Sequence, residues 1–180
     1  MRGRFGLLSR RRTSGLALAL TLALLSTTGW TAASLASEDF GRWERSTGSC
    51  RVGRLRPAGP GERALSCRTL RLDQQLPGLL SVRFVVPIEG SRFASHQLVF
   101  AGVLLRSSAA MRCAQGRCEP RWPMRLQVSA VATAGFDRRG VATGLPQAQL
   151  ARGNCRLDER SASCEARSRD GETWQGDASW

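Results

Sequence analysis

Six cysteines and a single histidine are the residues whose types and spacing suggest chemistry. Cys113 and Cys118 flank Ala-Gln-Gly-Arg, a spacing that fits half of a metal site, a redox-active pair or a disulfide across a hairpin. A closed zinc site needs four Cys or His ligands, and a redox pair is usually Cys-x-x-Cys at a helix start. No helix pattern surrounds Cys113. We therefore expect neither metal nor cofactor, and favour a structural disulfide.

The positions of the turns predict how the cysteines pair. A two-residue turn at Gln115-Gly116 places Cys113 opposite Cys118 at a non-hydrogen-bonded position. Cα atoms are about 4.5 Å apart there, within the range of a disulfide. A turn at Glu159-Arg160 does the same for the last two cysteines. The sequence predicts three disulfides between neighbours: Cys50–Cys67, Cys113–Cys118 and Cys155–Cys164.

The first of these pairs closes around the strongest turn pattern of the chain, "PAGPGE" from Pro57 to Glu62. An even number of cysteines behind an export segment is typical of disulfides in an oxidising compartment. The pairing, like the cysteine count, is therefore an argument for an exported protein.

The N-terminus has the pattern of a signal peptide over residues 1–36. Arginines precede an apolar stretch from Gly15 to Leu25, and Ser34-Leu35-Ala36 supplies small residues for cleavage. The apolar stretch is short for a membrane span, although an uncleaved anchor stays an alternative. Twin arginines within Ser9–Gly15 give only weak support for a twin-arginine export route. We expect an exported protein of the periplasm, the extracellular space or an equivalent lumen.

The charge of the chain favours anionic partners. Five of its 27 basic residues and none of its 14 acidic ones precede Ser37, so the expected mature chain carries +8, that is 22 minus 14. Every basic residue is arginine and tyrosine is absent, which is typical of a GC-rich coding bias. A positive surface attracts anions whatever its origin. Nucleic acid is disfavoured, because no aromatic and basic motif of the usual binding folds is present.

Candidate catalytic groups are few. Acyl transfer needs a base beside its nucleophile, and His96 opens an apolar strand with no nucleophile motif near it. Paired-carboxylate chemistry would have to draw on scattered acids, which the sequence favours as solvated turns: Glu89, Glu119, Asp137, Asp158 and Glu159. We predict no catalytic residue and no enzyme, with a cell-envelope hydrolase as the weakest alternative.

The alternation of apolar residues predicts an all-β fold. Leu79–Val86 and Met124–Ala132 alternate with period two, whereas 96–106 is apolar on both faces and fits a central strand or a buried helix. Asp137–Gly140 predicts a type I turn. We expect a linker or edge segment over 37–48 and one domain over 49–180, an antiparallel meander of about eight or nine strands in a small barrel or sandwich.

The C-terminal hairpin is predicted around Asp170-Gly171, which sets Arg167 against Trp174 in a cation–π pair. Arg and Trp often anchor interfaces. The leading hypothesis is therefore a non-catalytic domain that binds a protein or an anionic envelope component. Its candidate recognition surface is Arg121, Trp122, Arg125, Arg167 and Trp174. The alternative is a lipocalin-like barrel that binds a small apolar ligand in its mouth.

Overall fold

The computed structural model describes residues 39–56, 64–90 and 94–180. These ranges contain strands and turns, with no helix that could cross a membrane. The predicted signal peptide and the Pro57–Glu62 turn lie outside them. The strands are β1 (Gly41–Ser46), β2 (Ser49–Leu55), β3 (Leu65–Ser66), β4 (Thr69–Leu76), β5 (Leu79–Pro87), β6 (Ser95–Leu104), β7 (Arg112–Ala114), β8 (Arg117–Glu119), β9 (Met124–Phe136), β10 (Gln147–Asp158), β11 (Ser161–Ser168) and β12 (Thr173–Ser179).

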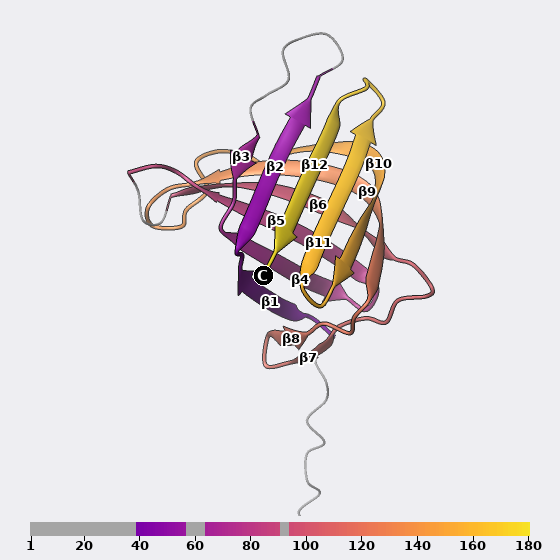
Figure 1. The fold of residues 1–180 in the computed structure, drawn as a ribbon. Helices are drawn as coiled ribbons and strands as arrows, with labels where there is room; N and C mark the ends of the chain where they lie inside the picture. Colours follow the sequence, from indigo (N-terminus) through magenta and orange to yellow (C-terminus); the bar gives the residue numbers. More distant parts are fainter. Residues whose placement is uncertain (1–38, 57–63, 91–93) are drawn as a thin grey trace, which may run out of the picture. The chain divides into compact units, whose positions relative to one another are not determined.

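The twelve strands form one curled sheet, in the order β3-β2-β12-β11-β10-β9-β6-β5-β4-β1-β8-β7. Figure 1 shows β2, β12 and β11 running steeply in front of β4, β5 and β6, which cross behind them. The register shifts where β9 meets β6 (Ala101/Gly102) and where β10 meets β9 (Leu150/Gly153). Such bulges bend strands, and here they lie where the sheet turns from one layer into the other. The predicted all-β, mostly antiparallel fold with three disulfides is confirmed as a half-barrel.

The core lies between the two layers. The alternation predicted for β5 places Leu80, Val82 and Phe84 in the interior, each at most 1% exposed. Phe84 meets Phe100 of β6 edge to face, with ring centroids 5.8 Å apart. Across the core its ring lies against β12, where a Cβ added to Gly176 would be only 2.7 Å from the ring. Each fully buried side chain of this size stabilises the fold by about 1.5–3 kcal/mol.

The apolar stretch 96–106 forms β6, so the strand prediction holds and the buried helix does not. β6 pairs with β5 on one side and β9 on the other. Because neighbouring strands flank it, Val99 on the outer face is buried as well as Phe100 on the inner face. A central strand explains why this stretch is apolar on both sides.

The structure has more strands than the eight or nine expected, since short strands escape a period-two pattern. β3, β7 and β8 have two or three residues each. The segment 37–48, expected as a linker or edge, contains β1, which pairs with β4 over six residues. Among the described strands, the small β7–β8 hairpin alone continues the sheet beyond β1, through one parallel bridge from Arg42 to Arg117.

The three disulfides join the cysteines in the predicted pairs, with Cα separations of 4.9 Å for Cys50–Cys67, 4.0 Å for Cys113–Cys118 and 4.1 Å for Cys155–Cys164. β10 and β11 pair as the turn at Glu159-Arg160 predicts, from Asp158 opposite Ser161 outward to the disulfide. At Gln115-Gly116 both φ angles are positive (52° and 73°), as a type I′ hairpin turn requires.

The predicted register of the C-terminal hairpin is wrong by one residue. Arg167 lies opposite Thr173, and Trp174 lies opposite Ala166. The turn contains three residues rather than two, since the Ser168 N–H donates to Glu172 O at 2.9 Å and the Gly171 N–H donates to Ser168 O at 3.2 Å. Gly171 has a positive φ of 89° but Asp170 does not, whereas a two-residue type I′ turn needs positive φ at both. The cation–π partner of Trp174 is consequently Arg54 of β2, at 5.7 Å from the ring centroid, and not Arg167.

Candidate ligand-binding cavity

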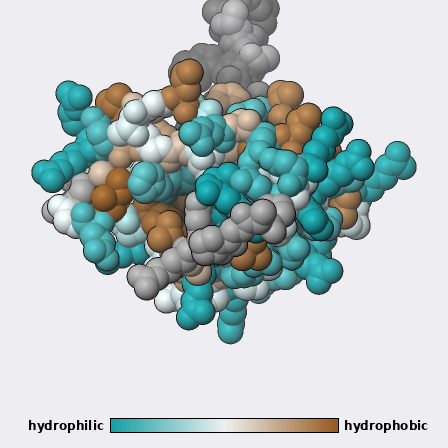
Figure 2. All heavy atoms as spheres, turned by 90° about the horizontal axis from the view of Figure 1, so that it is seen from above, coloured by the Kyte–Doolittle hydropathy of each residue, from teal (hydrophilic) through white to brown (hydrophobic). Residues whose placement is uncertain are grey.

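A cavity of about 410 Å³ opens at the end of the half-barrel where β2 and β9 end and β6 and β12 begin. Figure 2 shows the molecule from the side on which β2 ends, with apolar and hydrophilic side chains interspersed over that face. The cavity is lined by Val52, Gly53, Arg54, Leu65, Val86, His96, Gln97, Leu98, Thr133, Ala134, Gly135, Thr143, Gly144, Leu145, Gln147 and Trp174.

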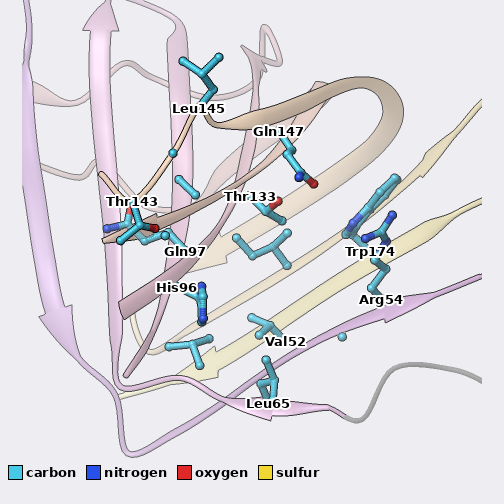
Figure 3. Close-up of a pocket in the computed structure, with 16 residues that line it drawn as sticks. Val52, Arg54, Leu65, His96, Gln97, Thr133, Thr143, Leu145, Gln147 and Trp174 are labelled. Atoms are coloured by element: carbon cyan, nitrogen blue, oxygen red, sulfur yellow. The ribbon is translucent and has the colours of Figure 1, made fainter. Parts of the chain in front are cut away.

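Strand alternation brings the main lining side chains to the inner face. Leu98 of β6 is the register partner of Thr133 of β9, and Arg54 of β2 is the partner of Trp174 of β12. Figure 3 shows Arg54 and Trp174 on one side of the cavity, with His96 and Thr143 on the opposite side. Four strands far apart in sequence therefore build one cavity.

One part of the lining is apolar and buried. Val52, Val86 and Leu98 are 6–7% exposed, and Trp174 is 2% exposed. Leu145, in contrast, is 93% exposed on the segment between β9 and β10. A lining of this kind suits the apolar part of a small molecule, because burying it there removes apolar surface from water.

Another part of the cavity lining is charged and belongs to an ion-pair network beside Trp174. Arg54 donates to both carboxylate oxygens of Glu172, at 2.6 and 2.7 Å, and Gln149 Nε2 donates to Glu172 Oε2 at 3.2 Å. Arg56 lies 3.5 Å from the same carboxylate. The hydrogen bonds from Arg54 hold the pKa of Glu172 below its ordinary value of 4.5, against the opposing effect of burial. The network fixes the Arg54 side chain at the cavity.

The segment after β9 folds back over the cavity. The Thr143 N–H donates to Gly135 O at 2.9 Å. A Cβ added to Gly135 would lie 2.6 Å from Thr143 Oγ1 and 3.5 Å from His96 Nδ1. Glycine is therefore needed here so that Thr143 and the His96 ring can share the mouth of the cavity.

The predicted type I turn at Asp137–Gly140 holds this segment. The Gly140 N–H donates to Asp137 O at 3.0 Å, and Gly140 has a φ of 78°. The backbone N–H groups of Val141 and Arg139 donate to Asp137 Oδ1, and these bonds lower the pKa of the Asp137 carboxyl. The Asp137 carboxylate therefore stabilises this turn.

The cavity lining contains few titratable groups. Its titratable lining groups are Arg54, which is paired with Glu172, and His96. Nowhere in ranges 39–56, 64–90 and 94–180 do three or more His, Cys, Asp or Glu side chains gather as metal ligands would. Apolar contacts and hydrogen bonds from Thr133, Thr143 and Gln147 are what the lining residues offer to a molecule.

The five residues of the predicted recognition surface do not come together. Trp174 is buried and lines the cavity, and Arg167 lies on the outer face of β11. Arg125 of β9 forms an ion pair with Asp158 at 3.2 Å. Arg121 is exposed beside Trp122, which belongs to a different cluster.

That cluster consists of Trp43, Trp122 and Trp180, with ring centroids 5.5–6.0 Å apart. The three rings are partly buried against the core. Each indole ring packs against the other two, so the aromatic surface of this cluster is in contact with other parts of the protein.

The acids considered for catalysis do not gather in one cluster, and the two that are adjacent in sequence, Asp158 and Glu159, lie at the β10–β11 turn. Asp158 is paired with Arg125, and Asp137 stabilises its turn. Glu89, Glu119 and Glu159 are exposed in loops or at the β7–β8 hairpin.

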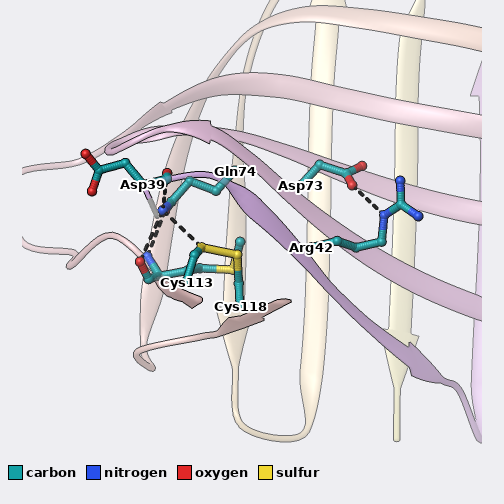
Figure 4. The surroundings of a disulfide bond; sticks show 7 residues. Asp39, Arg42, Asp73, Gln74, Cys113 and Cys118 are labelled. Carbon is teal, nitrogen blue, oxygen red and sulfur yellow. Dashed lines mark hydrogen bonds and ion pairs between the residues drawn. A yellow bond between two sulfur atoms is a disulfide. The ribbon is translucent and has the colours of Figure 1, made fainter. Parts of the chain in front are cut away.

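The Cys113–Cys118 disulfide, considered first as a chemical site, lies against a buried glutamine (Figure 4). Gln74 of β4 is 3% exposed, and its Nε2 donates to Met111 O, Asp39 O and Cys113 Sγ at 3.1, 3.0 and 3.4 Å. Its Oε1 accepts from the Met111 N–H at 2.8 Å. The glutamine anchors the disulfide-closed hairpin to the sheet.

Sequence reasoning missed Arg54, Thr133, Gln149 and Glu172. One pattern pointed toward Arg54, since it shares a face of β2 with the apolar Val52. An arginine at an inward position of a strand needs a buried partner, but the sequence does not say which acid supplies it.

Comparison with known proteins adds no assignment: no protein-family model, curated protein or solved structure matches this chain.

Proposed function

We propose that the protein is a non-catalytic carrier or sensor domain that binds a small, partly apolar molecule in the cavity of the half-barrel. The observation that carries this proposal is the cavity of about 410 Å³, with buried Val52, Leu98 and Trp174 facing polar side chains. Sites for small molecules have this size and mixed lining, typically about 300–1,000 Å³.

The state of Arg54 supports a ligand with a hydrogen-bond acceptor. Its Nε is buried and has no hydrogen-bond partner within the described part of the chain. A buried donor without a partner costs about 1–3 kcal/mol. A carbonyl or hydroxyl oxygen on the ligand would remove this cost once a rotation of the Arg54 side chain turns the enclosed Nε–H toward the cavity, while Glu172 already neutralises the charge of Arg54.

The disulfides favour an oxidising environment, where such bonds persist. We place the protein outside the cytosol, in a periplasm or an equivalent lumen, with residues 1–36 as its signal peptide. This part of the proposal depends on the N-terminal sequence pattern. Sequencing the N-terminus of the exported protein tests it, and a start near Ser37 is expected.

The binding proposal is tested by titrating the fluorescent probe N-phenyl-1-naphthylamine into the protein and into two variants. Thr133→Trp fills the cavity from β9, whereas Gln175→Trp adds the same side chain on the exposed outer face of β12. We expect saturable fluorescence enhancement for the wild type and Gln175→Trp, and at least about tenfold weaker binding for Thr133→Trp. Equal binding by both variants, or no binding by the wild type, would overturn the proposal.

A further inference from the structure

A groove of about 720 Å³ lies on the outer face of the sheet, separate from the cavity, over β6, β9, β10 and β11. It forms where the register shift between Leu150 and Gly153 interrupts the regular pairing of β10 with β9. It is lined by Val103, Gln127, Val128, Ser129, Leu150, Ala151, Arg152, Gly153, Arg167, Ser168 and Arg169.

Three arginines occupy one side of this groove. Arg152 of β10 and Arg167 of β11 are direct register partners, and Arg169 follows two residues after Arg167. All three are exposed. Like charges directly opposite on neighbouring strands repel each other, so this arrangement does not serve the stability of the sheet.

These guanidinium groups have no partner in the residues that the structure describes: none of the three forms an ion pair or a side-chain hydrogen bond. Other arginines do, as Arg71 does with Glu44 at 2.8 Å. The nearest acids in sequence are Glu165 and Asp170, and the Asp170 carboxylate accepts from Ser168 Oγ. The lining of the groove itself therefore contains three arginines and no acid, with Glu165 and Asp170 outside it.

Exposed apolar side chains lie on the same face, beside the arginines. Leu150 is 69% exposed and Val103 is 54% exposed. Leu79 of β5, the register partner of Val103, continues this surface and is 38% exposed. The row of register partners from Leu79 runs through Val103, Gln127 and Asn154 to Glu165, and Arg167 is the next outward-facing residue of β11 after Glu165. Since neighbouring strands are about 4.8 Å apart, this row extends over about 20 Å.

We propose that this face docks on a membrane surface of anionic phospholipid, with a lipid phosphate held by Arg152, Arg167 and Arg169. A single guanidinium group can donate two parallel N–H hydrogen bonds to two oxygens of one phosphate. Leu150 and Val103 then enter the boundary between headgroups and acyl chains, as apolar side chains of peripheral proteins do. An acidic polypeptide would satisfy the arginines but gives no reason for protruding aliphatic side chains beside them.

Co-sedimentation with vesicles tests the proposal. Vesicles of phosphatidylcholine with about 30% phosphatidylglycerol are compared with pure phosphatidylcholine. The groove variant carries Arg152→Gln, Arg167→Gln and Arg169→Gln. The matched control carries Arg112→Gln, Arg117→Gln and Arg121→Gln, three exposed arginines in and after the β7–β8 hairpin. Both variants keep residues 1–36, and each loses three positive charges. Any contribution of the N-terminal segment or of net charge alone to vesicle binding is therefore the same in the two variants.

We expect the groove variant to bind the anionic vesicles about 100-fold more weakly than wild type, since each arginine near such a surface contributes roughly fivefold. The control variant should keep most of the binding, and Leu150→Ser should weaken it without changing its dependence on salt. Equal losses in both triple variants would overturn the proposal, as would binding to polyglutamate without binding to vesicles. Equally tight binding of free inorganic phosphate would also overturn the lipid as the occupant.

Discussion

At the scale of single residues, two kinds of position are expected to affect the free energy of unfolding most. One is a glycine that a neighbouring backbone approaches too closely for a side chain, and the other is the acid that neutralises an inward-facing arginine. Gly153 belongs to the first kind, since a Cβ there would be 1.9 Å from Glu165 O of the neighbouring strand. Glu172 belongs to the second.

Gly153→Ala is expected to lower the free energy of unfolding by about 3 kcal/mol, at the upper end of overpacking costs. The added methyl group meets backbone rather than a flexible side chain, so the pairing of β10 with β11 must open. Gly53→Ala is the control, because Gly53 also lies in a strand but has nothing within 4 Å of an added Cβ. Its change should stay below about 1 kcal/mol. Urea denaturation measures both, and similar losses would contradict this account of Gly153.

Glu172 makes stability depend on pH. Its pKa is lower in the folded protein than its ordinary value of 4.5. Its carboxylate therefore stabilises the fold above about pH 4.5, and this contribution is lost as the pH falls through the folded pKa. We expect the stability difference between wild type and Glu172→Gln in urea denaturation to shrink as the pH is lowered from about 5. A difference that stays constant as the pH falls would show that the ion pair does not contribute.

At the scale of elements, the small β7–β8 hairpin depends on a residue from another strand. Gln74→Leu leaves the buried N–H and carbonyl of Met111 without a partner. We expect a loss of about 2–3 kcal/mol from the cost of such orphaned groups. Gln75→Leu, at the exposed next position, should change stability by no more than about 0.5 kcal/mol. Guanidinium denaturation measures the two variants, and an equal effect would refute the anchoring role of Gln74.

Local turn chemistry explains which elements could be predicted from sequence. The β10–β11 hairpin was predictable to the residue, because a two-residue turn at Glu159-Arg160 and the Cys155–Cys164 pair specify the same register. The C-terminal hairpin was not, because "RDG" supports either a two-residue or a three-residue loop. In the structure Gly171 has positive φ and Asp170 does not, and Ser168 pairs with Glu172; this longer loop keeps Trp174 in the core.

The cavity was beyond prediction for a different reason. Arg54, Leu98, Thr133 and Trp174 each look like ordinary strand residues in sequence. They meet only because the bulged β9 and β10 curl the sheet and bring β2 and β12 over β6. No local sequence pattern predicts how strands so far apart in the chain come together, although the apolar residues on both faces of β6 did predict a central strand.

At the scale of the whole described domain, the disulfides close loops of different length, with separations of 17, 9 and 5 residues for Cys50–Cys67, Cys155–Cys164 and Cys113–Cys118. Loop-closure entropy predicts about 3 kcal/mol for the longest loop and about 2 kcal/mol for the shortest. Paired Cys→Ser variants should therefore lose stability in that order in thermal unfolding. The reverse order would show that local packing, and not chain entropy, governs their effect.

The half-barrel has unlike ends: tryptophans 43, 122 and 180 pack together in one cluster, whereas Trp174 lines the cavity. The indole N–H signals of ¹⁵N-labelled protein therefore test the central proposal directly during titration with N-phenyl-1-naphthylamine. We expect the Trp174 signal to shift with the binding isotherm while the three clustered indoles stay in place. Shifts confined to the clustered tryptophans, with Trp174 unmoved at saturation, would contradict ligand binding in the cavity.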